Sequence, residues 1–492
     1  MAEGHASAAG VRLAAAAGYA STARIDHLRA TEYRHLDRDG RVYLDYTGAG
    51  VAARAQIVAH HDRLLAGPYS NPHSENPTSE ATGTLVASAR RAVLDFFRAD
   101  PAEYVVVFTP NASGACRLVG EAYDFGRDRP LVLTWDNHNS VNGIREYARA
   151  ARAPVRYVPL AGPDLRVAES DLIAALTASR RGPTGRPRWR GSGPAGLLAY
   201  PAQSNFTGVQ HPLEWVDLAR RHGYDVLLDA AAFAPTNRLD VGTVRPDFVC
   251  LSFYKLFGYP TGVGALLARR DALARLRRPW FAGGTIRAVS VQGDWHQPMA
   301  DESGFEDGTL NFLSLPDVEF GLRWLDSIGV DLVHTRVGLL TGWLLEQLTA
   351  LRHRNGRPLV GVYGPATGDA RGGTVAFNFR YPDGSLVDER LVAFESSAAG
   401  FALRTGCFCN PGAAEAAFGI SRRSLRRTDL AHAGTIDQHL AALGLPTGGA
   451  VRVSFGLAST AADAERFLTF AESTYLDRDG PADVRLPPRI RC

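Results

Sequence analysis

Lys255 is the residue whose type and position say most about chemistry in this sequence. It follows the apolar run Asp247–Leu251, which is typical of a buried strand, and it lies in the glycine-rich segment Ser252–Gly262. Lysine side chains are mostly exposed, so a lysine that a buried strand delivers into a turn needs a reason. Burial lowers the pKa of an amine and makes it a Schiff-base nucleophile. The alternative is a lysine that extends from the strand end to the surface.

A carboxylate ends an earlier apolar run. Asp229 closes the segment Tyr224–Asp229 and is followed by three alanines. In open α/β sheets, ligands bind beyond the carboxyl ends of the strands. Pyridoxal phosphate (PLP) requires a lysine that forms a Schiff base with it and an acid that keeps its pyridine nitrogen protonated. Asp229 and Lys255, each at a turn of small residues, are consistent with that chemistry.

The elements that must position these two residues alternate along the chain. The predicted strands are Tyr104–Thr109, Leu131–Trp135, Val155–Val158, Leu197–Pro201, Asp225–Asp229, Phe248–Ser252 and Gly264–Ala268. The predicted helices are Gly83–Arg98, Ala112–Tyr123, Asn142–Ala151, Ser170–Ser179 and Pro212–His222. Strands that alternate with helices predict an α/β fold with a mainly parallel, doubly wound sheet.

The pattern changes past residue 300. Two helices are predicted there, Pro316–Ser327 and Val330–Arg352, and then short strands at Thr374–Phe379 and Val451–Phe455. A chain of 492 residues is long enough for two subdomains. We therefore predict a large domain over residues 41–300 and a smaller α/β domain formed by residues 1–40 and 301–492.

Composition excludes several classes of function. The chain is 45% hydrophobic and 21% charged with a formal net charge of +3, which is typical of a soluble globular protein. Nothing indicates a nucleic-acid partner, because the arginines between Arg180 and Arg190 lie in a Pro/Gly-rich loop that is typical of a solvated insertion. No apolar run reaches the length of a membrane span. Five scattered cysteines and the lack of a signal peptide favour the cytoplasm.

Six segments, in order, carry a family resemblance. They are LDYTGAG (44–50), SNPHSENPTSEAT (70–82), DNHNSVNGIREYA (136–148), SNFTG (204–208), SFYKLFGYPTGVGAL (252–266) and RTGCFCNPGAA (404–414). Over about residues 43–459 the chain resembles the class V aminotransferase group of fold-type I PLP enzymes. Within that group it is most similar to the cysteine desulfurases and to the N-terminal desulfurase domain of molybdenum cofactor sulfurases.

The resemblance implies the residues that hold the PLP phosphate. It places the phosphate at Ala112 and Ser113, where a helix begins after a strand and offers free N–H groups to an anion. Ser113 as a simple helix cap would predict the same residue type. Ser252 and Tyr254 are further phosphate candidates. Many desulfurases have histidine where Tyr254 stands, but molybdenum cofactor sulfurases have tyrosine.

The resemblance also assigns the groups around the ring. His138 is expected to stack on the ring and assist proton transfer, which suits an imidazole. Asn205 matches the amide that binds the ring hydroxyl. Ala232 departs from common desulfurases, which have glutamine at this place, although the molybdenum cofactor sulfurases lack it too.

The segment Arg404–Gly412 is expected to carry a second chemical function. Its Cys-x-Cys pair could be half of a zinc site, but no second cysteine pair or suitably spaced histidine follows, so no metal is predicted. The resemblance makes Cys409 the nucleophile that takes sulfur as a persulfide, with Cys407 as the near alternative. Arg452, together with Arg404, is expected to bind the substrate carboxylate, since a guanidinium suits bidentate carboxylate binding.

The resemblance further implies the assembly and the reaction. Thr285, after Gly283 and Gly284, resembles the segment that reaches the partner subunit's phosphate, which implies a homodimer; an ordinary glycine-rich turn is the alternative. The expected reaction converts L-cysteine to L-alanine, with sulfur passed to Cys409 and then to an acceptor protein or cofactor. In molybdenum cofactor sulfurases a C-terminal domain binds the cofactor that receives sulfur; we expect that domain to be missing here or to be a separate protein.

Other functions remain open at this stage. The same scaffold could carry out β-elimination as a C–S lyase, act as a selenocysteine lyase, or catalyse another class V reaction in specialised metabolism. A binding protein that kept the fold without catalysis is a second alternative, against which the presence of Lys255, Asp229 and His138 argues. A sulfur-carrier scaffold that acts through partner docking is a third.

Overall fold

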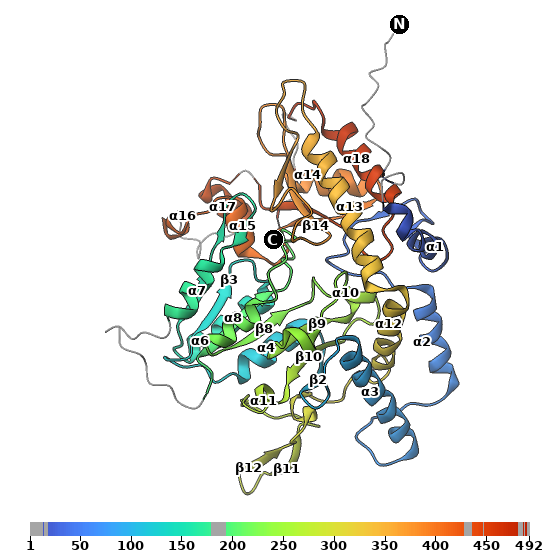
Figure 1. The fold of residues 1–492 in the computed structure, drawn as a ribbon, viewed down its shortest axis with the longest axis vertical. Helices are drawn as coiled ribbons and strands as arrows, with labels where there is room; N and C mark the ends of the chain where they lie inside the picture. The colour runs from blue at the N-terminus through green and yellow to red at the C-terminus, as the bar shows by residue number, and fades with distance from the viewer. Residues whose placement is uncertain are drawn as a thin grey trace.

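A seven-stranded sheet forms the centre of the fold (Figure 1). The computed structural model describes residues 13, 18–178, 193–427, 435–445, 447–480, 486, 488 and 489. The strand order is β2 (Tyr104–Thr109), β10 (Gly264–Arg269), β9 (Phe248–Ser252), β8 (Tyr224–Asp229), β7 (Gly196–Pro201), β3 (Leu131–Thr134) and β4 (Val155–Val158). β10 is antiparallel to both of its neighbours, and the other pairs are parallel. The predicted mainly parallel sheet is therefore confirmed.

Helices cover both faces of this sheet, and the side chains of each strand alternate between the two apolar layers. Val249 and Leu251 of β9 pack with α3 (Pro77–Phe96), α7 (Glu169–Ala178), α8 (Trp215–Arg221) and α12 (Leu315–Ile328). Phe248 and Cys250 pack on the other face with α4 (Ala112–Ala122), α6 (Ile144–Ala150) and α11 (Arg270–Leu273). Each fully buried Val or Leu stabilises the fold by about 1.5–3 kcal/mol relative to exposure. This double packing fixes the strand ends from which the site is built.

A second, four-stranded antiparallel sheet lies in the C-terminal part of the chain. Its order is β13 (Val360–Tyr363), β14 (Thr374–Phe379), β17 (Ala450–Ser454) and β16 (Arg404–Gly406). It shares an apolar core with α13 (Val330–Ala350), α14 (Glu389–Ala398) and α18 (Ala461–Tyr475). The early strand β1 (Val42–Tyr43) pairs with β15 (Phe401–Ala402), so the start of the chain joins this C-terminal part.

The remaining elements connect or extend these layers. They are α1 (Arg24–Thr31), α2 (Arg54–Ala66), α5 (Asn139–Asn142), α9 (Val241–Val244), α10 (Phe253–Phe257), α15 (Pro411–Ala417), α16 (Arg422–Arg427), α17 (Ile436–Leu443), β5 (Leu160–Ala161), β6 (Arg166–Val167), β11 (Ile286–Ser290) and β12 (Trp295–Pro298), with 3₁₀ turns at Tyr19–Thr22, Arg34–Leu36 and Glu302–Phe305. The hairpin β11–β12 extends away from the large sheet at the lower end of the molecule (Figure 1).

The strands agree with the sequence prediction to within one residue, whereas some helix boundaries were wrong. α3 begins at Pro77 rather than at Gly83, because the Asn76 side chain caps it by accepting from Ser79 N at 3.0 Å. The single helix predicted from Asn142 is divided into α5 and α6 at Gly143.

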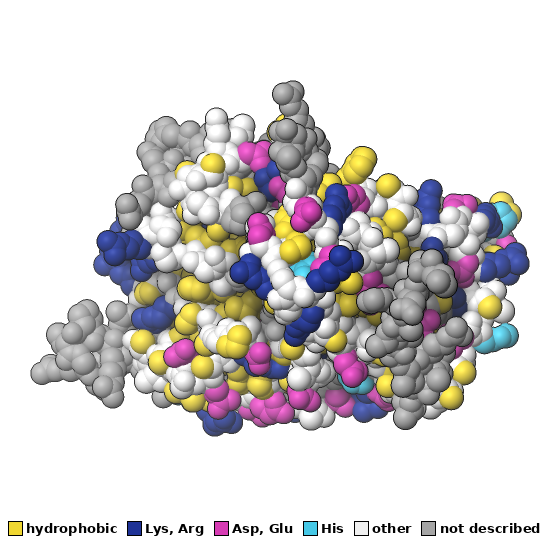
Figure 2. Space-filling model, turned by 90° about the horizontal axis from the view of Figure 1, so that it is seen from above, with side chains coloured by type: hydrophobic (Ala, Val, Ile, Leu, Met, Phe, Trp, Pro, Cys, Tyr) yellow, Lys and Arg dark blue, Asp and Glu magenta, His cyan; other side chains and the backbone are white. Residues whose placement is uncertain are grey.

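The start of one more helix differs from the prediction. α8 starts at Trp215, three residues after the predicted Pro212. The arginine-rich loop 180–190, Ser179 and Cys492 lie outside the described residues. In the described part of the chain, no helix is both long and apolar enough to cross a membrane. Basic and acidic side chains are interspersed over the face that Figure 2 shows.

Candidate active site

Lys255 lies in α10, directly after β9, at a tightly packed turn. Gly258, which ends α10, has a φ of 85°, and a Cβ there would lie 2.2 Å from the backbone N of Ala52. The N–H of Gly50 donates to the carbonyl of Tyr254 at 3.0 Å, which ties the same two segments together. Only glycine combines this conformation with such a close approach. The turn therefore fixes the backbone that carries Lys255.

The environment of Lys255 is suited to a neutral amine. Burial lowers the pKa of Lys255, and the Asp229 carboxylate acts in the opposite direction without cancelling that effect. Asp229 ends β8 and accepts a hydrogen bond from Ala231 N at 3.0 Å. Lys255 is only partly enclosed by side chains, because one side of it borders a cavity. The alternative of a lysine that simply extends to the surface does not describe this position.

The cavity beside Lys255 has a volume of about 100 Å³ and gathers residues from many strand ends. Eight residues that the sequence predicted for the site line it, namely Ala112, Ser113, His138, Asn205, Asp229, Ser252, Tyr254 and Lys255. It is also lined by Gln203, which the sequence analysis did not single out. Cys409, Thr285, Arg404 and Arg452 are not among its lining residues.

The N-terminus of α4 forms one wall of the cavity. Asn111 caps this helix, because its side chain accepts from Gly114 N at 2.9 Å. Ser113 is therefore not the cap, and its hydroxyl lies 2.5 Å from the hydroxyl of Ser140 across the wall. A helix start with two hydroxyl groups beside it is a suitable site for an anion. The capping alternative for Ser113 is wrong.

His138 forms a second wall and has a defined tautomer. The backbone N–H of Ser140 donates to Nδ1 of His138 at 3.1 Å, so this nitrogen carries no proton in the neutral ring and Nε2 does. Burial lowers the pKa of His138, and the nearby Lys255 adds to the effect. The imidazole is therefore held neutral near pH 7, with its N–H at Nε2.

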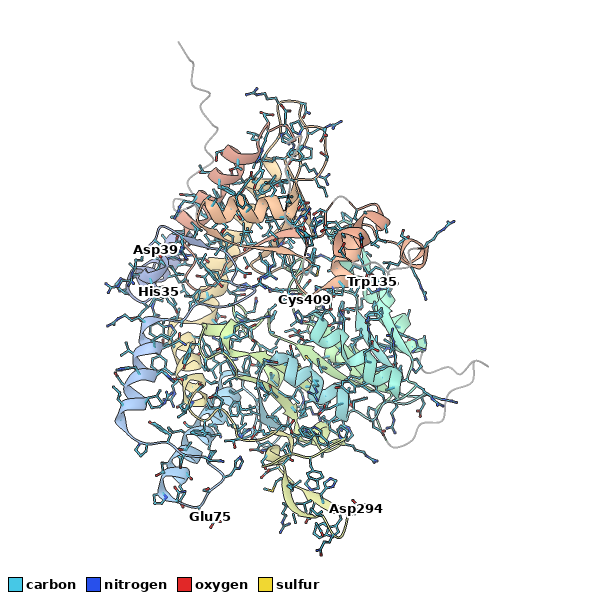
Figure 3. The ribbon with its side chains drawn as sticks, turned by 180° about the vertical axis from the view of Figure 1, so that it is seen from behind. His35, Asp39, Glu75, Trp135, Asp294 and Cys409 are labelled. Carbon is cyan, nitrogen blue, oxygen red and sulfur yellow. The ribbon has the colours of Figure 1, made fainter. Side chains whose placement is uncertain are left out.

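The loop that carries Cys409 follows β16 and has an unusual backbone. Phe408 and Cys409 have φ angles of 55° and 54°, a left-handed conformation that is rare outside glycine and is found at functional sites. Cys407 is buried in a small apolar cluster, whereas Cys409 is exposed. In Figure 3, Cys409 lies near the middle of the molecule between the two sheets. The exposed thiol is thus the one that a substrate or acceptor can reach.

Backbone bonds join this loop to the cavity wall. The carbonyl of Cys409 accepts from Asn139 N at 2.7 Å. The side chain of Asn205 donates to the carbonyl of Phe408 at 2.8 Å. Asn205 thus lines the cavity and also holds the cysteine loop, a second contact that the sequence analysis missed.

Arg452 and Arg404 share one carboxylate. Arg452 is buried and donates from Nη2 to Asp45 at 2.8 Å and from Nη1 to the carbonyl of Asn205 at 2.9 Å. Arg404 donates from Nε and Nη2 to the other oxygen of Asp45 at 2.9 and 2.7 Å. Asp45 lies within the motif LDYTGAG, and the sequence alone indicated no role for it. It holds both arginines beside the cysteine loop, where the Arg452 guanidinium lies 4.7 Å from the centre of the Phe408 ring.

Thr285 lies at the base of the β11–β12 hairpin. It is buried, and its hydroxyl donates to the carbonyl of Ala282 at 2.8 Å, which closes the turn after Gly284. Asp294, at the hairpin tip, lies far from Cys409 in Figure 3. Thr285 therefore contributes to a turn of this chain and does not line the cavity.

The residues present fit PLP. An amine of lowered pKa, a strand-end carboxylate, an imidazole and a helix N-terminus surround one cavity, and each corresponds to a separate need of the cofactor: covalent attachment, a protonated ring nitrogen, a ring contact and phosphate binding. No two of these groups come from the same strand. Only a folded sheet brings them together, so the fit does not follow from any single motif.

The chain belongs to the aminotransferase class-V family, whose model matches residues 42–467. Its fold is that of the fold-type I PLP-dependent transferases. It is similar to a cysteine desulfurase from Thermococcus onnurineus NA1, with a TM-score of 0.72 and 23% identity over 91% of this chain and 97% of that one. It is also similar to the cysteine desulfurase CsdA from Escherichia coli, with a TM-score of 0.69 and 19% identity over 91% and 98% of the two chains.

Sequence relatives are more similar than the solved structures. The molybdenum cofactor sulfurase of Solanum lycopersicum is 36% identical over 93% of this chain and 58% of its own length. That of Arabidopsis thaliana is 36% identical over 92% of this chain and 58% of its own length. The chain therefore spans less than two thirds of the length of these relatives.

Proposed function

We propose that this chain is a PLP-dependent cysteine desulfurase that converts L-cysteine to L-alanine and carries the sulfur as a persulfide on Cys409. The observation that carries the proposal is the convergence of the Lys255 amine, the Asp229 carboxylate and the His138 imidazole on one cavity. The loop of Cys409 is bonded to Asn139, which lies between the lining residues His138 and Ser140. Membership of the class V family and the similarity to sulfurases and desulfurases support it.

The cavity residues would hold the cofactor as follows. Lys255 would bind it covalently, and Asp229 would keep its ring nitrogen protonated. The α4 N-terminus at Ala112 and Ser113 would bind the phosphate with Ser252 and Tyr254, and Asn205 would meet the ring hydroxyl with its second amide N–H. When bound, the cofactor supplies an electron sink for bond changes at the substrate carbons.

The other residues would act on the substrate. Arg452 and Arg404 would bind its carboxylate, which joins or displaces Asp45 at the two guanidinium groups. His138 would move a proton through Nε2. The Cys409 thiolate would attack the substrate sulfur, so that an S–S bond forms and the substrate C–S bond breaks. The electron pair of that bond stays on the carbon skeleton, which is released as alanine after protonation.

Product analysis tests this proposal. The purified protein, supplied with PLP and L-cysteine, should release alanine and, with a thiol reductant, an equal amount of sulfide. Pyruvate in place of alanine would mean β-elimination and would establish the lyase alternative. A protein that neither binds PLP nor changes cysteine would contradict both and leave a binding role. Selenocysteine as a competing substrate shows whether selenium is preferred to sulfur.

We also propose a homodimer in which Thr285 lies near the phosphate of the partner's cofactor. Large apolar side chains around the hairpin support an interface there, since Phe281 is 42% exposed, Val291 93% and Trp295 54%. Light scattering should give twice the chain mass of 53.0 kDa. Val291→Glu should shift the protein toward the monomer and weaken cofactor binding. A wild-type monomer with full cofactor occupancy and activity would contradict the dimer.

Three further parts of the proposal concern the cellular setting and the domains. An acceptor protein or cofactor would take the sulfur from Cys409, whose exposure allows its approach. The cytoplasm is the proposed compartment, because the five cysteines of the sequence are few and scattered along the chain. The proposed domains are residues 41–300, and residues 1–40 together with 301–492; the pairing of β1 with β15 and the bond between Arg336 and Asp26 support the inclusion of the N-terminal segment.

A further inference from the structure

Asn410 follows Cys409 directly and uses its whole side chain in hydrogen bonds. It is completely buried. Its Oδ1 caps α15 by accepting from Ala413 N at 3.2 Å. Its Nδ2 donates to the carbonyl of Asp136 at 2.7 Å and to Oδ1 of Asn205 at 2.9 Å. A cap alone would need only the oxygen, so the two donated bonds require a separate explanation.

The two acceptors of Asn410 belong to two separate segments of the chain that contribute to the cavity. Asp136 lies two residues before His138, and Asn205 lines the cavity itself. One buried amide therefore joins the cysteine loop to the segment of the proposed proton-transfer group and to the segment of a proposed cofactor contact. Side-chain networks of this kind are costly to leave partly paired in a protein interior.

Two further hydrogen bonds hold the same loop. Asn205 donates to the carbonyl of Phe408, and Asn139 donates from its backbone to the carbonyl of Cys409. Both Phe408 and Cys409 have left-handed backbones, a conformation that persists only where the surroundings enforce it. Gly412 presses the start of α15 onto the same region, because a Cβ there would lie 2.1 Å from the carbonyl oxygen of Trp135.

We propose that Asn410 is a positioning residue that holds the Cys409 loop in place beside the cavity. The inference rests on the desulfurase function proposed above. It adds that sulfur transfer depends on this fixed position of the loop. Asn410 touches neither substrate nor cofactor and acts through the backbone of Phe408 and Cys409 and through the side chain of Asn205.

Asn410→Ser tests the proposal, because serine keeps a capping oxygen for α15 but is too short to reach Asp136 and Asn205. Asn410→Asp keeps the oxygen at full length and removes both donated bonds, so it serves if the serine variant folds poorly. Asp240→Ala is the matched control: it removes the cap of α9, where Asp240 accepts from Thr243 N at 3.0 Å, and does not line the cavity.

Two measurements are made on the PLP-loaded wild type and variants. Hydrogen exchange of the amides in residues 406–412 should become about tenfold faster in the Asn410 variants, the effect expected from loss of a buried hydrogen bond. The kcat for alanine should fall about tenfold or more, while the KM for cysteine and the spectrum of the bound cofactor stay unchanged. The control should match the wild type in both.

Each other outcome overturns part of the argument. Unchanged exchange in residues 406–412 would show that Asn410 does not hold the loop. Faster exchange with kcat within twofold of the wild type would show that the fixed position of the Cys409 loop does not matter for sulfur transfer. If the wild type itself makes no alanine, the proposed function fails, and the exchange measurement still decides whether Asn410 locks the loop.

Discussion

The cavity wall and the cysteine loop hold their reactive groups by different means. Asp229 and Lys255 follow neighbouring strands that are buried on both faces, so their positions depend on regular backbone and on many apolar contacts. Cys409 and its neighbour Phe408 instead have left-handed backbones, and a few polar bonds hold them in place. Many small contacts tolerate the loss of one, whereas a few polar bonds do not. Cofactor retention and sulfur abstraction should therefore be separable by mutation.

Lys255→Ala should have the largest effect, because it removes the proposed covalent link on the cavity side. Turnover should fall by more than about 1,000-fold, as when a covalent nucleophile is lost. After borohydride reduction, mass spectrometry should find a pyridoxyl group on the wild-type chain and none on the variant. A label that persists in the variant would mean that another residue carries the cofactor.

Cys409→Ser should break the loop side and leave the cavity side intact. The variant should keep the cofactor spectrum and still bind cysteine, yet alanine release should fall by more than about 100-fold, since sulfur abstraction needs a thiolate. Cys407→Ser is the matched control and should keep much of its activity, because Cys407 is buried in an apolar cluster. Mass spectrometry should find an added sulfur that only the Cys409 variant loses. The reverse pattern would make Cys407 the nucleophile.

Asp45→Asn should lower the stability of the loop side. It would leave the buried Arg452 without its charged partner, so the free energy of unfolding should fall by about 3 kcal/mol. Urea unfolding followed by circular dichroism measures this change. Asp95→Asn, which breaks an exposed pair with Arg91, should cost less than about 1 kcal/mol. Equal losses in the two variants would show that the buried pair contributes no more to the free energy of unfolding than the exposed pair.

The smallest expected effect is a pH dependence on the cavity side. Because the pKa of His138 is lowered in the fold, the unfolded chain takes up a proton as pH falls below about 6.5 while the folded ring stays neutral. The free energy of unfolding should therefore decrease from pH 7.5 to pH 5.5. His138→Gln should show a smaller decrease in the cofactor-free protein. An identical decrease in both proteins would contradict the buried, neutral imidazole.

Much of the cavity side could be predicted from the sequence, because its signals are local. Short β-branched runs predicted the strands to within one residue, and strand-end residues such as Lys255 and Asp229 met in one cavity. The helix that begins at Pro77 was predicted too late because its start depends on a single capping side chain, Asn76, rather than on apolar periodicity.

The loop side was only partly predictable, because its contacts join distant parts of the chain. Family resemblance identified Cys409, but nothing in the spacing of residues indicated that Asp45 would join Arg404 and Arg452. The bond from Asn139 to Cys409 joins backbone atoms on both sides, so it could not be predicted from the types of the residues. Gln203 was missed because a glutamine near a strand end is common and has no fixed partner in sequence.

The bond between Asp45 and Arg452 can form only late in the synthesis of the chain. The two residues are 407 positions apart. At about 5–20 residues per second, a ribosome needs roughly 20 to 80 s to synthesise the stretch between them. Once Arg269 has been added, the nascent chain holds every strand of its large sheet, while Arg452, the arginine proposed to bind the substrate carboxylate, does not yet exist. The proposed substrate end of the site is thus completed only when synthesis is nearly over, whereas the strand ends proposed to hold the cofactor are made long before.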